Sequence, residues 1–204
     1  MNRNFWCAGA VTALAAIPSW SLLHAQTAPA TMVVSSATIK SMDVIPADHT
    51  ADGKDVSPAL TWTGAPAATR EFALIMDDPD APMPQPFVHW VIYKIPATAK
   101  GLPAAIPAGP VSVSGLAGAI QGLTGFDAFR RANAPPSAPG YRGPAPPPGK
   151  PHHYTFTVYA LDAPLDVKEG LTKAALLKAM EGHIIGQGQL VGLYERKAAA
   201  TPGH

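Results

Sequence analysis

The acidic turn after the apolar residues 72–76 carries the side chains best suited to chemistry. Residues 77–82 read DDPDAP, and His89 follows at the start of another apolar segment. Proline fixes φ and lacks a backbone donor, so Pro79 and Pro82 should end the strand and hold the carboxylates in few conformations. Carboxylates beside an imidazole can bind small polar ligands and exchange protons near neutral pH. The sequence therefore predicts a compact polar site at one end of the fold.

A second segment, rich in proline, precedes the clearest strand of the sequence. Residues 143–147 read GPAPP, and His152, His153 and Tyr154 follow shortly after them. Successive strand residues point to opposite faces, so only one of the two histidines can face a given pocket. The glycine and prolines would form a rigid wall that lets a ligand approach the backbone closely. Tyr154 and the upstream Tyr141 could offer hydroxyls or ring faces, although Tyr154 is equally consistent with a packed core position.

Together these segments resemble the two signatures of the phosphatidylethanolamine-binding protein family, also called Raf-kinase-inhibitor-like proteins. The first signature matches residues 78–82 with His89, and the second matches residues 143–147 leading into His152. Two motifs in the right order are far more specific than either alone. The similarity runs from about residue 38 to residue 196 and is closest to the bacterial branch. The family is known for binding lipid headgroups and for inhibiting kinases or proteases.

The resemblance implies an anion pocket with polar contacts from Asp78, His89 and His152. It assigns the pocket-facing role to His152 and leaves His153, which stands where many relatives have arginine, as a surface or bracing residue. A bare carboxylate repels phosphate, so Asp78 must be protonated, bridged by water or paired with an imidazole, for which His89 is the candidate. Asp80 lies between two prolines, and we expect it mainly to lock the turn. The full predicted ligand-binding set is Asp78, Pro79, Asp80, Pro82, His89, Tyr141, Gly143, Pro144, His152 and Tyr154.

Strand-like segments dominate the sequence and predict the fold class. Residues 71–76 and 88–95 lack strict alternation, which favours strands covered on both faces. Residues 154–161 alternate apolar and polar side chains as a strand does, whereas 172–181 begins with the N-cap candidate Thr172 and has helical periodicity. We expect a mainly β protein, an antiparallel β-sandwich with one or two short peripheral C-terminal helices, as the resemblance also implies. Residues 184–185 and 189–194 should form a last turn and strand.

The domain boundaries follow from changes in composition. Residues 1–25 combine Arg3, an apolar run and a terminal alanine, as in a signal peptide, and the apolar run is too short for a convincing membrane span. Residues 26–37 should be a flexible lead-in, 38–197 the family domain and 198–204 a tail. Within the domain, residues 97–151 form a long loop rich in glycine, proline and alanine, and residues 130–138 look like an insertion relative to the family.

The predicted cleavage would leave a secreted, periplasmic chain with no cysteine, because the single Cys7 lies in the signal peptide. Removing Arg3 lowers the 15 basic residues to 14, which equals the 14 acidic residues. This balance argues against a nucleic-acid partner. The acids Asp52 and Asp55 lack the spacing of a calcium loop, and no zinc motif is present.

From these features we expect an exported binder of a small anion, either a phosphate-bearing headgroup or a phosphorylated or carboxylated ligand, without turnover. No cofactor is expected. The main alternative is an inhibitor or modulator of a protein partner; export makes a cytoplasmic kinase a poor target. A hydrolase or lyase that uses the same aspartate and histidines is a more distant alternative, because no activated nucleophile or phosphate-binding glycine loop is found.

Overall fold

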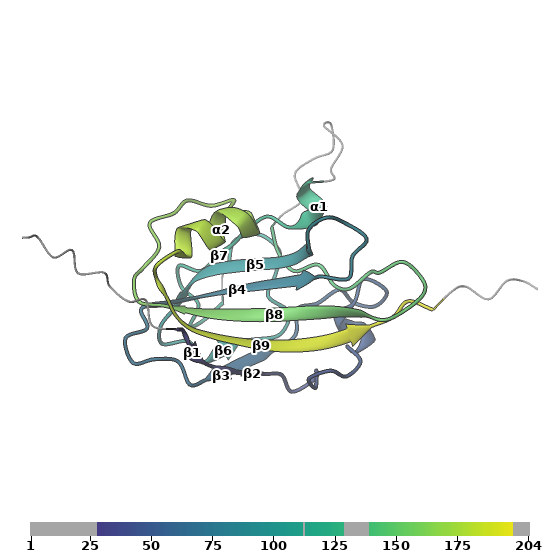
Figure 1. Cartoon of the computed structure of the whole chain (residues 1–204), viewed down its shortest axis with the longest axis horizontal. Coiled ribbons are helices and arrows are strands. Elements are labelled where there is room, and N and C mark those ends of the chain that lie inside the picture. The colour runs from purple at the N-terminus through teal and green to yellow at the C-terminus, as the bar shows by residue number, and fades with distance from the viewer. Residues whose placement is uncertain (1–27, 112, 129–138, 198–204) are drawn as a thin grey trace, which may run out of the picture.

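Two β-sheets pack face to face, and helix α2 covers the outer face of the larger one (Figure 1). The computed structural model describes residues 28–111, 113–128 and 139–197. In this part of the chain the larger sheet has the order β1-β9-β8-β4-β5-β7 and the smaller the order β2-β3-β6. The strands are β1 (Ala30–Thr31), β2 (Val33–Ser35), β3 (Leu60–Thr63), β4 (Glu71–Asp78), β5 (Phe87–Pro96), β6 (Gly101–Leu102), β7 (Ile120–Gln121), β8 (His152–Leu161) and β9 (Ile184–Tyr194). The helices are the 3-10 turn η1 (Ala47–His49), α1 (Gly125–Ala128) and α2 (Lys173–Met180).

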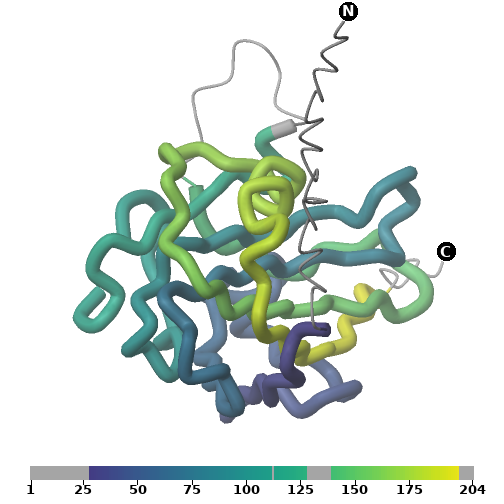
Figure 2. Tube along the Cα trace, turned by 60° about the vertical axis from the view of Figure 1, so that its left-hand side comes forward, coloured from purple at the N-terminus to yellow at the C-terminus, as the bar shows by residue number. Residues whose placement is uncertain are grey.

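Both faces of the central strands are buried, which explains their unbroken apolar sequence. Trp90, Phe156 and Val158 belong to the core between the sheets, whereas Ala73 and Val91 face the second core under α2. The two cores lie on opposite faces of the large sheet. Figure 2 shows the path of the backbone from a second direction. The predicted mainly β sandwich with a peripheral C-terminal helix is therefore confirmed. Only the β1–β9 pair is parallel among the strand pairs of the described residues.

Helix α2 begins and ends as its sequence predicts. The Thr172 side chain accepts a hydrogen bond from Ala175 N at 3.3 Å, which makes it the N-cap. Leu176 and Met180 are fully buried against the large sheet. Gly182 adopts a φ of 81°, a left-handed conformation that glycine tolerates and that ends the helix.

Three regions differ from the sequence-based expectation. Strand β1 lies within residues 26–37, which we expected to be a lead-in, and β6, β7 and α1 interrupt the expected loop 97–151. Strand β9 is continuous from 184 to 194 instead of being split by a turn. A Cβ on Gly188 would lie 2.4 Å from the Met32 carbonyl oxygen, so glycine allows the N-terminal segment to lie against β9. Strands of two residues leave no periodicity to detect.

The predicted signal peptide 1–25, the insertion 130–138 and the tail 198–204 lie outside the described residues. Among the described residues, no helix is long and apolar enough to cross a membrane.

Candidate functional site

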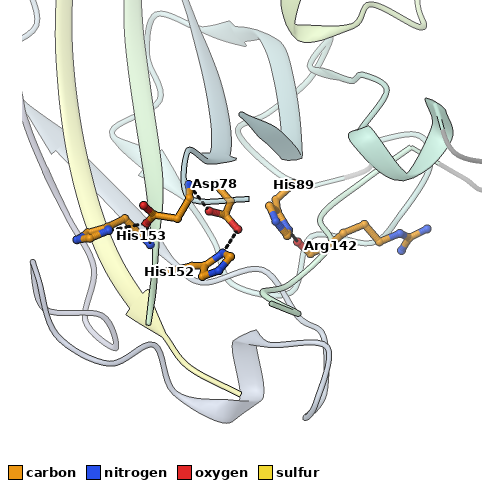
Figure 3. A network of polar contacts seen from close by, with 6 residues as sticks. Asp78, His89, Arg142, His152 and His153 are labelled. Carbon is orange, nitrogen blue, oxygen red and sulfur yellow. Dashed lines mark hydrogen bonds and ion pairs between the residues drawn. The ribbon is translucent and has the colours of Figure 1, made fainter. Parts of the chain in front are cut away.

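Three neighbouring strands meet at one end of the large sheet and bring the predicted polar residues together. Strand β4 is antiparallel to both β5 and β8, so its last residue, Asp78, lies beside the first residues of those two strands. Strand β5 carries His89 near its start, and β8 begins at His152. Residues that are 74 positions apart in the sequence thus come into hydrogen-bond contact (Figure 3).

His89 owes its position to an irregularity in β5. Met76 pairs with Trp90 but Asp77 pairs with Val88, so His89 is the extra residue of a β-bulge. Because of the bulge, the next residue, Trp90, reaches the core between the sheets although Val88 packs toward α2. A bulge commonly redirects a side chain beside a functional site, and here it places His89 at the cavity. Nothing in the sequence indicates it.

The polar residues form one wall of a small cavity of about 190 Å³. Asp78, His89, His152 and Tyr154 supply its polar groups, and no lysine or arginine occurs among the described residues that line it. The remaining lining residues are apolar: Ala81, Pro82, Met83, Phe87, Phe126, Ala145, Pro146 and Pro147. The rings of Phe87 and Phe126 pack edge to face, with their centroids 4.7 Å apart. The cavity therefore combines a polar wall with an apolar rim.

The sequence had suggested His89 as the imidazole partner of Asp78. In the structure Asp78 is paired with His152 instead. Its Oδ2 accepts a hydrogen bond from His152 Nδ1 at 2.8 Å, and its Oδ1 accepts one from Asp80 N at 2.8 Å. The side chains of Asp78 and His152 are almost fully buried, with exposed fractions of 5% and 8%. His89 is unavailable because its Nδ1 donates to the Arg142 carbonyl at 2.8 Å, and Arg142 N donates back to the His89 carbonyl. The two histidines are thus held by different partners.

Burial lowers the pKa of His89, and the Arg142 carbonyl and the Asp78 charge only partly oppose this effect. The ring is therefore neutral near pH 7. Since Nδ1 carries the proton that goes to Arg142, Nε2 holds a lone pair and acts as an acceptor.

This lowered pKa predicts acid-sensitive stability. The unfolded chain binds the His89 proton first, so the free energy of unfolding should be constant above about pH 7.5 and fall as the pH drops through about 6.5. One proton contributes a slope of at most about 1.4 kcal/mol per pH unit, and the slope ends below the folded-state pKa. Urea unfolding across this range should show a smaller slope for His89→Gln than for the wild type. Equal slopes for His89→Gln and the wild type would contradict the assignment.

Tyr154 lines the cavity, whereas Tyr141 does not. The Tyr154 hydroxyl is buried and makes no hydrogen bond of normal geometry with a described residue. Burial and the nearby Asp78 charge raise its pKa, so it keeps its proton and remains a donor. Tyr141 instead donates to the His49 carbonyl at 2.6 Å and packs edge to face on Trp90. Its part is to hold the loop that carries residue 142.

Asp80 fastens the turn to β8 and lies outside the cavity lining. Its Oδ2 accepts hydrogen bonds from His153 N at 2.8 Å and from His153 Nδ1 at 2.6 Å, which lower the pKa of Asp80. Figure 3 shows His153 on the side of β8 opposite to His152, as the alternation of a strand requires. Pro82 lines the cavity, but Pro79 does not.

Gly143 and Pro144 also lie outside the lining; residues 145–147 form the wall instead. A Cβ on Gly143 would lie 2.6 Å from the His49 carbonyl oxygen and 2.7 Å from the Thr50 Cα. The glycine therefore allows two chain segments, and not a ligand, to approach closely. Of the apolar lining residues, Pro82 was in the predicted set, and residues 145–147 belong to the GPAPP segment that was expected to form a wall. Met83, Phe87 and Phe126 were not predicted, and among these three only Phe87 had a usable signal, since it lies two residues before His89.

The two acids Asp52 and Asp55 have protein partners. Asp52 accepts hydrogen bonds from Tyr194 and Arg196, and Asp55 accepts one from Gly143 N at 2.6 Å. Among the described residues, no group of three or more histidine, cysteine, aspartate or glutamate side chains is placed to hold a metal ion.

A family model described as phosphatidylethanolamine-binding protein matches residues 35–195. The chain belongs to this family. A UPF0098 protein of Methanothermobacter thermautotrophicus is 42% identical to this phosphatidylethanolamine-binding protein family member over 153 residues, covering 74% of this chain and 91% of the relative. A UPF0098 protein of Pyrococcus abyssi is 41% identical over 167 residues, which cover 81% of this chain and 86% of the relative.

The fold of this family member also matches a solved structure. The Escherichia coli protein YbcL, described as a new member of the mammalian PEBP family, superposes with a TM-score of 0.70 at 32% sequence identity. The match covers 81% of this chain and 99% of YbcL. The resemblance drawn from the two sequence segments is thereby confirmed at the level of family and fold.

Proposed function

We propose that this protein binds a small anion in the cavity between Asp78, His89 and His152, without turning it over. The anion is a phosphate-bearing headgroup or a similar phosphorylated or carboxylated ligand. The observation that carries the proposal is the polar wall of the cavity, where Asp78, His89 and His152 converge with Tyr154, whose buried hydroxyl lies near Asp78 but makes no hydrogen bond of normal geometry with a described residue. A buried polar group of this kind has a high cost unless a ligand or water satisfies it. An anionic oxygen would accept its hydrogen bond.

The Asp78–His152 pair explains how a cavity that contains a carboxylate can accept an anion. When His152 is protonated, its charge offsets that of Asp78, and its Nε2–H can donate to the ligand while Nδ1 stays bonded to Asp78. The neutral His89 offers an acceptor, which suits a ligand oxygen that carries a proton.

Binding without chemistry agrees with the residues around the cavity. The described lining contains no serine, threonine, cysteine or lysine that could act as an activated nucleophile. This weakens the hydrolase alternative. A protein partner is the second candidate function, because Met83 and Phe126 are 39% and 38% exposed at the cavity rim and could contact another protein. The predicted signal peptide supports a secreted, periplasmic location.

Isothermal titration calorimetry on the chain from Gln26 onward tests the proposal with inorganic phosphate, phosphoethanolamine and acetate. We expect saturable binding of one ligand per chain. Absence of saturable binding by all three ligands at about pH 6 would reject the small-anion proposal and favour a protein partner.

A further inference from the structure

Adjacent acids at the end of β4 face opposite sides of the large sheet. Asp78 lines the anion cavity, whereas the Asp77 carboxylate accepts a hydrogen bond from Lys173 Nζ on α2. The Asp77 and Lys173 side chains are 15% and 25% exposed, so both are largely shielded from water. Asp77, the first acid of the segment 77–82, is thus neutralised by a cation from another element.

The position of Lys173 is not explained by the helix that carries it. Lys173 is the first residue of α2, directly after the N-cap Thr172. The N-terminal end of a helix carries partial positive charge, so a cation there is unfavourable to the helix itself. The ion pair with Asp77 provides the compensating interaction.

The apolar surroundings of the Asp77–Lys173 pair reduce the screening of its charges. Lys173 also lines an apolar cavity of about 350 Å³ together with Val88, Leu123 and Leu177. Charges beside apolar groups are screened less than charges in open solvent. The Asp77 charge is felt at His89, whose pKa it raises, although less than burial lowers it.

We infer that Lys173 is a positioning residue for the anion site, which acts through Asp77 and sets the net charge that an entering anion meets. The inference rests on the proposed function. Without Lys173, the end of β4 would carry an uncompensated carboxylate next to a cavity that has no lysine or arginine among its described lining residues. That charge would repel the anion.

The test is a charge cycle measured by phosphate titration. Lys173→Met should weaken phosphate binding about threefold to tenfold, and Asp77→Asn should strengthen it by a similar factor, as expected for the loss of one charge that acts on the ligand at intermediate dielectric. The double variant should bind as the wild type does. These differences should shrink when NaCl is raised from about 20 to about 200 mM. Lys178→Met, on the exposed last turn of the same helix, should have no effect.

A readout without ligand separates this inference from the proposed function. NMR titration of the His89 ring should give a higher pKa in Lys173→Met and a lower one in Asp77→Asn than in the wild type. The groups that act on His89 are the Asp78 and Asp77 charges on β4 and the backbone of Arg142 and Gly143, and His152 and Tyr154 on β8 line the same cavity.

Two results would overturn the inference. The first is an unchanged His89 titration in Lys173→Met, which decides the question even if the wild type binds no phosphate and the proposed function fails. The second is weaker binding in Asp77→Asn to the same degree as in Lys173→Met, because that pattern marks a purely structural ion pair.

Discussion

His152→Leu should abolish phosphate binding, with a loss of affinity of at least about 100-fold. The substitution removes a donor to the anion and leaves the buried Asp78 carboxylate without its imidazole partner. An unpaired buried charge both repels the ligand and destabilises the fold, by about 3–5 kcal/mol when one member of a buried pair is removed. Calorimetry and urea unfolding measure the two effects separately.

Two further variants separate loss of binding from loss of folding. The adjacent His153→Leu is the matched control, because His153 lies on the other side of β8 and bonds the partly exposed Asp80. It should keep phosphate affinity and lose no more than about 1 kcal/mol of stability. Adding Asp78→Asn to His152→Leu should restore much of the stability but not the binding. Phosphate affinity near the wild-type value in His152→Leu would show that the ligand binds elsewhere.

Sequence reasoning could bring the polar residues together because strand ends have simple geometry. An apolar run that ends in Asp78, and others that begin near His89 and His152, place all three at one end of an antiparallel sheet. The strand alternation also indicated correctly that His152 and His153 point to opposite faces. These inferences need only the two-residue periodicity of side chains in a strand and the order of the strands along the chain.

The choice of partners could not be read in the same way. Asp78 bonds His152 rather than His89 because the bulge at His89 and the carbonyl of Arg142, 53 residues downstream, fix the His89 ring. Both depend on long-range packing that leaves no local pattern. The turn was similarly ambiguous: Asp78 caps the Asp80 amide, while Asp80 itself reaches across to His153. A sequence shows which side chains can accept hydrogen bonds but not which donors tertiary packing will bring to them.

Gly143→Ala should lower the free energy of unfolding by about 1–3 kcal/mol, although it adds only one methyl group. The added Cβ would lie within 2.8 Å of three backbone atoms of His49 and Thr50, and backbone atoms cannot rotate away as a side-chain end can. The segment must shift, which also strains the 2.6 Å hydrogen bond from Gly143 N to Asp55. Because the preceding residue, Arg142, holds the His89 ring through its carbonyl, the shift should reach the anion site.

The expected consequence is weaker phosphate binding together with a changed His89 ring signal in NMR spectra, from a residue that does not line the cavity. Pro148→Ala, in the exposed part of the same segment, is the control and should preserve both stability and affinity. A Gly143→Ala protein with wild-type stability would mean that the His49 loop yields easily. In that case the ring of His89 would be held mainly by its own strand, and the hydrogen bond to Arg142 would follow its position without determining it.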